Sequence, residues 1–332
     1  MQPRWIVAGA ILLALALSDV QCRMEWIKHE QNPVLTEGPK GAWDAGEIIA
    51  ISPAREGEVY RIWYSADNGS RQSGIGLATS VDRIHWTKDP SNPILSNGPE
   101  ACDSSYVFAP CVLRDGQGYK MWYTGSNSES VWTICLATSA DGTHWTKYPG
   151  NPVLTPGPGW YDARDAGDPW VIFDDGLYKM WYTALNKTYV IAYATSTDGV
   201  HWTKAGPVLE PSREGPESSS VRGPCVVKTS PGYEMWYRGI GNTSPSWTVC
   251  YATSPNGVNW ARYAENPVLQ PGSWDAKIWF PRVLREQDRY SMWYTSTDSG
   301  VGKVGYAYLL VPERLCGAAL LGFALCLPGR RV

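Results

Sequence analysis

The sequence is dominated by an internal repeat. Residues 141–160, DGTHWTKYPGNPVLTPGPGW, join an Asp-Gly turn, a tryptophan and an Asn-Pro-Val-Leu motif. Variants of the Pro-Val/Ile-Leu core recur every 55 to 60 residues, at 32–35, 92–95, 151–154, 206–209 and 266–269. A Trp-Tyr pair recurs with nearly the same spacing, with its tryptophan at positions 63, 122, 181, 236 and 293. Two independent markers with one period restrict the chain to a repeat architecture.

Each repeat unit contains four short segments typical of β-strands. In the second unit they are APCVL, YKMWYT, TICLATS and HWTKY, which are rich in aromatic and β-branched residues. The turn sequences RDGQG and ADGT separate the first segment from the second and the third from the fourth. Asp-Gly turns favour hairpins because glycine tolerates a positive φ. Each unit is therefore predicted to form a four-stranded antiparallel sheet.

The two ends of the repeat predict a closed ring. A tryptophan marks the fourth strand of a unit, but the last unit ends at GKVGYAYLLV without one. Trp26 lies ahead of the first inner strand and is the unused copy of this marker. An N-terminal strand that completes the fifth sheet would hide the edges of an open array. The sequence predicts an all-β fold, a five-bladed β-propeller of four-stranded antiparallel blades, closed by the N-terminal strand around Trp26.

Both termini carry features of export. Residues 1–22 contain Arg4, an apolar run and a short polar stretch, as in a secretory signal peptide. The C-terminal segment VPERLCGAALLGFALCLPGRRV resembles the PEP-CTERM sorting signal of bacterial envelopes, and a short hydrophobic anchor is the alternative for residues 312–332. Its apolar run is shorter than the roughly 20 residues of a membrane span. We expect a propeller at residues 23–311 and an exported protein, extracellular or associated with the bacterial envelope.

Charge and cysteine content limit the partners and cofactors. The net charge of −3 argues against nucleic acid as a partner. Five cysteines fall within the repeats, and we expect buried free thiols because the first and third strands of a sheet are about 9.6 Å apart, beyond disulfide reach. No Cys and His spacing is typical of zinc, and no cofactor is predicted, although calcium on the axis is left open. We expect a monomer.

An acidic residue precedes the first strand of every unit. The five residues are Asp44, Asp103, Asp162, Glu217 and Asp275. A residue type that recurs in every blade favours a structural anchor. Asp103 and Glu217 are nevertheless retained as candidates for substrate binding, because the loops around them lie at the rim where sites are usually built.

Residues that break the repeat are the candidates for function. The candidate catalytic residues are the carboxylates Asp168, Glu47 and Asp165, because carboxyl groups can serve as general acid and base. The further candidates for substrate binding are Arg164, Arg222, Trp170, Trp279, Lys277 and Arg282. Aromatic faces beside charged groups suit a sugar. A salt-bridge network around the central tunnel would use the same residue types, so both interpretations stay open.

The repeat unit WxKxxxNPVLxxGxxxWDxxxxxxPxVxxxxxxYxMWYxGxxxxxxIGxATSxDGxxW resembles the five-bladed propellers of glycoside hydrolase families 43, 32 and 130. The resemblance implies a carbohydrate partner and either hydrolysis or phosphorolysis. If the reaction is phosphorolysis, Arg164 and Arg222 would hold phosphate. The positions of the family 43 carboxylates carry Ser52, Cys111 and Arg222 here, and ARDAGDP at 163–169 is a distorted form of the family 32 Arg-Asp-Pro motif. The resemblance therefore predicts an exported glycosidase or phosphorylase, with a non-catalytic propeller that binds glycan or protein at the cell surface as the alternative.

Overall fold

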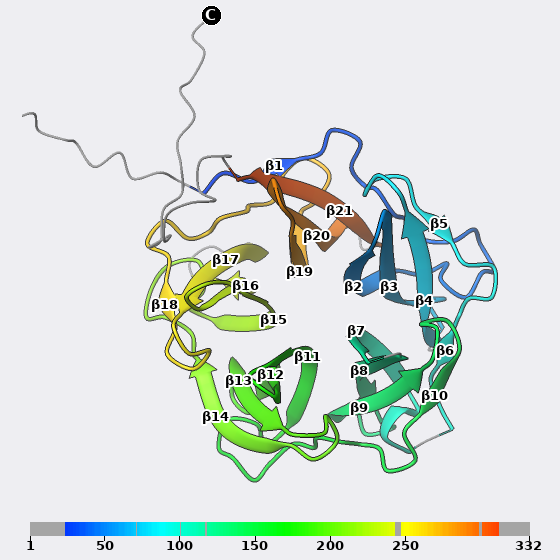
Figure 1. Ribbon diagram of the computed structural model, residues 1–332, viewed down its shortest axis with the longest axis horizontal. Coiled ribbons are helices and arrows are strands. Elements are labelled where there is room, and N and C mark those ends of the chain that lie inside the picture. The colour runs from blue at the N-terminus through cyan, green and yellow to red at the C-terminus, as the bar shows by residue number, and fades with distance from the viewer. Residues whose placement is uncertain are drawn as a thin grey trace, which may run out of the picture.

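The computed structural model describes residues 24–70, 72–99, 101–116, 118–242, 247–298 and 301–311. Five antiparallel sheets surround a central axis, one sheet for each repeat unit (Figure 1). Within these ranges the helical content is one short 3-10 helix, η1 (Ala101–Asp103), and no helix is long and apolar enough to cross a membrane. The predicted all-β, five-bladed propeller is confirmed.

The strands follow the repeat in order. The inner strands are β2 (Ile48–Glu56), β7 (Tyr106–Asp115), β11 (Asp165–Asp174), β15 (Ser220–Lys228) and β19 (Lys277–Arg285). The second strands are β3 (Val59–Asp67), β8 (Gly118–Ser126), β12 (Leu177–Leu185), β16 (Tyr233–Ile240) and β20 (Arg289–Asp298). The third strands are β4 (Ser73–Ser80), β9 (Trp132–Ser139), β13 (Tyr189–Ser196), β17 (Trp247–Ser254) and β21 (Val301–Leu310). The outer strands are β1 (Ile27–Lys28), β5 (Thr87–Lys88), β10 (Trp145–Lys147), β14 (Thr203–Leu209) and β18 (Ala261–Arg262), and β6 (Leu95–Ser96) also pairs with β4.

The N-terminal strand closes the ring. β1 pairs with β21, with Ile27 opposite Tyr308 and Lys28 opposite Ala307. Trp26 packs edge-to-face on Trp236 of the neighbouring blade at a centroid distance of 6.1 Å, as Trp202 packs on Trp122. The predicted closure around Trp26 is therefore confirmed.

The repeated tryptophans of the second strands bind adjacent blades together. The indole N–H groups of Trp63, Trp122 and Trp181 each donate to a glycine carbonyl in the next blade at 2.8 Å. Trp236 has no such partner among the described residues. The equivalent turn in the fifth blade would connect β21 to β1, and these strands come from opposite ends of the chain.

The Asn-Pro motif joins each blade to the next. In the third unit the Asn151 side chain accepts from Leu136 N–H at 2.8 Å and donates to Leu136 O at 2.9 Å, so it pairs with the exposed edge of β9. The leucine of the motif, Leu154, then bridges to Ile134 on the same strand. The chain is thereby held against one blade before it turns toward the next.

A buried acid and a cation from the outer strand form one ion pair in each blade. The pairs are Asp44 with Lys88 (2.6 Å), Asp103 with Lys147 (2.7 Å), Asp162 with Lys204 (2.5 Å), Glu217 with Arg262 (3.0 Å) and Asp275 with Lys28 (2.6 Å). The last pair uses the N-terminal strand, so the closing strand completes the fivefold pattern. The geometry favours the structural role for these acids.

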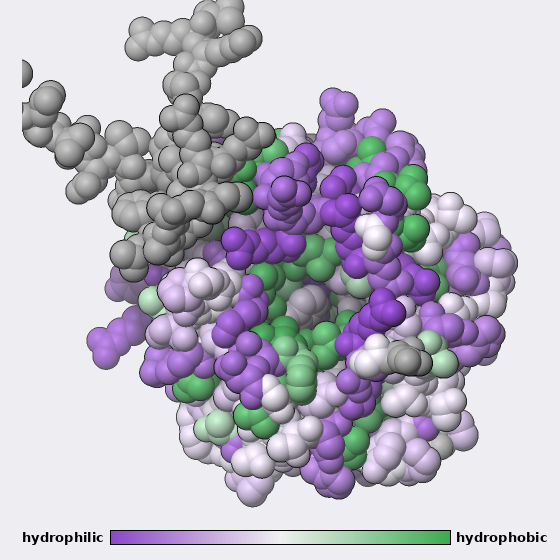
Figure 2. All heavy atoms as spheres, viewed as in Figure 1, coloured by the Kyte–Doolittle hydropathy of each residue, from purple (hydrophilic) through white to green (hydrophobic). Residues whose placement is uncertain are grey.

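The propeller contains five cysteines, and all of them are free thiols: Cys102, Cys111, Cys135, Cys225 and Cys250. The centre of the face in view is hollow, with hydrophobic residues around the hollow and hydrophilic residues toward the rim (Figure 2). The predicted signal peptide and C-terminal sorting segment lie outside the described residues.

Candidate active site

The inner strands carry a kink near the axis. In β7, β11, β15 and β19 the register shifts by a bulge just before the conserved position of a proline in the repeat. The residues that precede these prolines have positive φ values: Ala109 (49°), Asp168 (49°), Gly223 (58°) and Phe280 (28°). Non-glycine residues rarely adopt this backbone region, and such positions cluster at functional sites.

Asp168 occupies this kink in the third blade. Its side chain is completely buried, and its backbone N–H donates to Thr124 Oγ1 at 2.8 Å. Arg222 Nη2 lies 3.5 Å from Asp168 Oδ2, while neither carboxylate oxygen accepts a hydrogen bond from a described residue. Burying a carboxylate with one long ion pair destabilises the fold, because the ion pair does not compensate for the loss of hydration.

Asp165 lies at the start of the same strand. Its Oδ1 accepts from the backbone N–H of Trp132 at 3.0 Å, and Arg164 Nε lies 3.6 Å from its Oδ2. Burial raises the pKa of Asp165 above its ordinary 3.8 despite the nearby arginines. Arg164 itself points largely into solvent, with 67% of its side chain exposed.

Glu47 lies directly before β2, in a second acidic cluster. Burial, and then the nearby charge of Asp67, raise the pKa of Glu47 above its ordinary 4.5. Asp67 accepts hydrogen bonds from the Tyr106 hydroxyl and from Gly69 N–H. Sequence reasoning missed Asp67 because it considered only the first strands. Its equivalents at the ends of the second strands β8, β12 and β16 are uncharged, and that contrast was the available clue.

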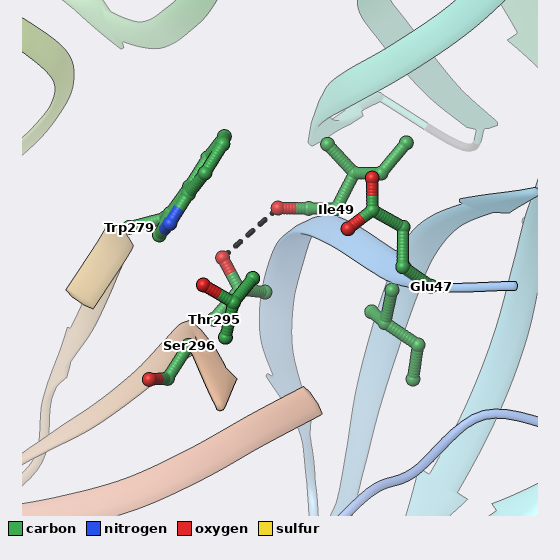
Figure 3. Close-up of a pocket in the computed structure, with 7 residues that line it drawn as sticks. Glu47, Ile49, Trp279, Thr295 and Ser296 are labelled. Atoms are coloured by element: carbon green, nitrogen blue, oxygen red, sulfur yellow. Dashed lines mark hydrogen bonds between the residues drawn. The ribbon is translucent and has the colours of Figure 1, made fainter. Parts of the chain in front are cut away.

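A small hollow separates Glu47 from Trp279. It is lined by residues at the start of β2 and by residues of β19 and β20 (Figure 3). Thr295 Oγ1 donates to Ile49 O at 2.9 Å in the lining of the hollow, and the indole N–H of Trp279 is buried without a hydrogen-bond partner among the described residues. A carboxyl group with a raised pKa thus faces an aromatic ring across the hollow. Protonating a sugar requires such an acid, and binding a sugar requires a flat surface such as this ring.

Two stacked guanidinium groups lie in the fourth blade. The Arg222 guanidinium is 4.0 Å from the ring centroid of Tyr189 and 5.2 Å from that of Trp132. The Arg238 guanidinium is 4.7 Å from the ring centroid of Trp247 and 5.1 Å from that of Trp279. Arg238 was not among the residues predicted from the sequence.

Lys277 lies at the start of β19, close to this aromatic group. Its Nζ is 5.2 Å from the ring centroid of Trp247, and its side chain is exposed to solvent. The structure therefore brings Glu47, Asp165, Asp168, Arg222, Lys277 and Trp279 to the same end of the inner strands.

Four of the residues predicted to bind substrate lie in buried structural contacts instead. Asp103 and Glu217 belong to the repeated ion pairs described above. Trp170 is 8% exposed and donates from its indole N–H to Val226 O at 2.7 Å. Arg282 is fully buried and donates to the carbonyls of Ile51, Gly223, Pro224 and Pro281. These contacts support a structural role for the four residues, and their role in substrate binding stays a prediction.

The described residues contain no group of three or more His, Cys, Asp or Glu side chains placed to hold a metal ion.

The family model for the glycosyl hydrolases family 32 N-terminal domain matches residues 53–192 and 186–308, which is most of the propeller. The chain belongs to this family. An uncharacterized protein of Mycobacterium tuberculosis is 31% identical over 293 residues, covering 81% of this chain and 94% of that protein. A vacuolar acid β-fructofuranosidase 2 of a Rosa hybrid cultivar is 33% identical over 142 residues, covering 40% of this chain and 22% of the enzyme.

Solved structures share the fold of this family 32 propeller. The β-1,2-mannobiose phosphorylase of Listeria innocua superposes with a TM-score of 0.70 at 15% identity, covering 86% of this chain and 97% of that one. The glycoside hydrolase-like propeller architecture predicted from the repeat is thereby confirmed.

Proposed function

We propose that this protein cleaves glycosidic bonds of an oligo- or polysaccharide at the rim where the inner strands begin. The observation that carries the proposal is Glu47, a half-buried carboxyl group with a raised pKa, placed across a hollow from the indole of Trp279. The names of the related proteins support carbohydrate as the substrate class, since they include a β-fructofuranosidase and a mannobiose phosphorylase.

Glu47 acts as the general acid in this proposal. A raised pKa keeps the carboxyl group protonated closer to neutral pH, so that it can donate a proton to the leaving oxygen of the glycosidic bond. Trp279 holds a sugar ring by stacking against its C–H face. The bond that breaks joins the anomeric carbon to the protonated oxygen.

Asp168 is the second carboxylate of the proposal. It lies on the kinked strand β11 beside Arg222, and it stabilises positive charge at the anomeric carbon or accepts the proton of the water that attacks this carbon, unless phosphate is the attacking group. Asp165 lies on the same strand, where it accepts a hydrogen bond from the Trp132 backbone N–H. Arg164 orients the substrate from the rim.

A non-catalytic propeller that binds glycan is the second candidate. The complete burial of Asp168 favours it, because a carboxylate that substrate cannot reach performs no chemistry. Turnover by the wild-type protein separates the two functions, and substitution of Asp168 tests whether this residue takes part in turnover.

The test incubates the protein with plant and bacterial polysaccharides and aryl glycosides, with and without phosphate, beside Asp168→Asn. We expect product release that falls by about 10²-fold or more in the variant, as for loss of a catalytic carboxylate. Phosphate-dependent release would identify a phosphorylase. Equal release by both proteins would remove Asp168 from the mechanism, and binding without turnover by the wild-type protein would establish the second candidate.

We also propose that the protein is exported and held at the bacterial envelope through its terminal segments. Residues 1–22 and 312–332 have the composition of a signal peptide and of a PEP-CTERM-like sorting signal. Cell fractionation with mass spectrometry of the purified protein tests this proposal. Intact termini in a cytoplasmic fraction would contradict it.

A further inference from the structure

The fourth blade departs from the repeat at two facing positions. Two residues after the conserved tryptophan of the second strand, the other four blades carry a hydroxyl group, in Ser65, Thr124, Thr183 and Thr295. The fourth blade carries Arg238 there. Directly opposite Arg238 in the register of β15 and β16 lies Arg222.

The hydroxyl groups of the other blades have a structural purpose. Thr124 Oγ1 accepts from Asp168 N–H at 2.8 Å, and Thr183 Oγ1 accepts from Gly223 N–H at 3.0 Å, so each satisfies the kink of the next blade. Arg238 cannot accept a hydrogen bond because a guanidinium group only donates. The fourth blade therefore gives up a stabilising contact at the position where it acquires a second positive charge.

Neither arginine is well paired. Arg238 is 2% exposed, and its Nε and Nη2 are buried without a hydrogen-bond partner among the described residues. Arg222 Nε is likewise unpaired, and its ion pair with Asp168 is 3.5 Å long. Like charges directly opposite one another on adjacent strands are destabilising. Among the described residues, Asp168 is the only carboxylate in an ion pair with Arg222, Asp165 lies farther from it, and Arg238 forms no ion pair.

Aromatic rings surround both guanidinium groups. Tyr189 and Trp132 lie beside Arg222, while Trp247 and Trp279 lie beside Arg238. Stacking on the rings fixes the planes of both guanidinium groups. It does not satisfy their N–H groups, which remain available to a hydrogen-bond acceptor. Arg222 is the more accessible of the two arginines, because 13% of its side chain is exposed whereas Arg238 is 2% exposed.

We infer that Arg222 and Arg238 form a binding site for an oxyanion, a carboxylate, sulfate or phosphate group carried by the saccharide. Planar guanidinium groups with free N–H edges match the geometry of such groups, and one bound anion would neutralise the excess charge. The aromatic rings supply stacking for the attached sugar. This inference rests on the proposed carbohydrate-binding function and narrows the substrate to an acidic glycan.

Calorimetry with the full chain tests the site. The probes are an oligogalacturonate, a neutral oligosaccharide of the same length, and inorganic phosphate and sulfate alone. The test variant is Arg238→Thr, which restores the residue type of the other blades. The matched control is Arg114→Thr, which removes an exposed cation near the opposite end of β7.

We expect the wild-type protein and Arg114→Thr to bind the acidic oligosaccharide about tenfold or more tightly than the neutral one, with the preference weakened by salt. Arg238→Thr should lose the preference while keeping its melting temperature, because Thr can accept the hydrogen bond that the arginine cannot. Binding of phosphate alone, lost in Arg238→Thr, would identify a free anion as the occupant.

Equal affinities for charged and neutral sugars, or a preference unchanged in Arg238→Thr, would overturn the inference. Should Arg238→Thr fail to fold, Arg222→Gln answers the same question at the more exposed partner. The two proposals fail separately. Cleavage of neutral glycans without charge preference would end the oxyanion site alone, and tight anion binding without any turnover would end the enzymatic proposal alone.

Discussion

Single residues at the rim show how burial and charge oppose one another. Asp165 is 2% exposed, and burial raises its pKa although Arg164 and Arg222 lie nearby. The protonated form is therefore favoured in the folded protein, so its contribution to stability is complete below the unfolded pKa and is lost as pH rises through the folded pKa.

Asp165→Asn should therefore unfold at a higher denaturant concentration than the wild-type protein at pH 7. Asparagine keeps an oxygen for the Trp132 N–H and carries no buried charge. The difference should shrink at pH 4, because the raised pKa means that a larger share of the wild-type carboxyl groups is protonated there than at pH 7. Urea titrations at both pH values measure it, and a less stable variant at pH 7 would show that ion pairs outweigh burial at this position.

The cysteines differ in burial and in pKa, which predicts different reactivities. Cys102 is partly exposed, its Sγ lies 3.2 Å from Cys135 Sγ, and the hydrogen bond between them lowers its pKa. Burial instead raises the pKa of Cys111 to about 11 and that of Cys225 to about 12. We expect iodoacetamide to modify Cys102 at least about tenfold faster than the buried thiols near neutral pH, because the thiolate is the nucleophile. Peptide mass spectrometry over time measures the rates, and uniform labelling would contradict the expectation.

At the scale of elements, the ring depends on one short strand. β1 contributes only Ile27 and Lys28 to the sheet, yet Trp26 packs on Trp236 and Lys28 binds Asp275. The indole N–H of Trp236 lacks the inter-blade hydrogen bond found for its counterparts in the first three blades. The closure is therefore the site where loss of packing has the least compensation.

Trp26→Ala should lower the free energy of unfolding by about 3–5 kcal/mol, the usual cost of removing a buried tryptophan. The control Trp160→Ala removes a side chain that is 63% exposed and should change stability by less than about 0.5 kcal/mol. Chemical denaturation measures both values. Similar small losses in the two variants would mean that the N-terminal strand does not hold the ring closed.

The sequence predicted the elements better than the site. Period, turn chemistry and the unused Trp26 were sufficient for the propeller, because each blade buries the same residues in the same way. Asp67 and Arg238 were missed because their meaning depends on which strand ends meet at the axis, and the kink at Asp168 is a backbone property that residue type does not encode. Asp103 and Glu217 each form the ion pair that recurs in every blade. The repeat in the sequence therefore already indicated a structural role for these two acids.

At the scale of the whole molecule, five similar blades form a rigid frame whose irregular residues converge on one rim. Acidic groups gather at the first and third blades, in Glu47, Asp67, Asp165 and Asp168. Cationic and aromatic groups gather at the fourth and fifth, in Arg222, Arg238, Lys277, Trp247 and Trp279. Under the proposed function, this uneven distribution of charge would favour one orientation of a bound saccharide.

The central claim is that Glu47 protonates a leaving oxygen, and its most direct test compares substrates that differ only in the leaving group. The rates of the wild-type protein and Glu47→Gln are measured on an aryl glycoside with an acidic phenol, which leaves without protonation, and on the corresponding alkyl glycoside or oligosaccharide. We predict a loss of about 10²- to 10⁴-fold on the alkyl leaving group and a much smaller loss on the acidic phenol. Equal losses on both substrates, or none on either, would contradict the assignment of Glu47 as the acid.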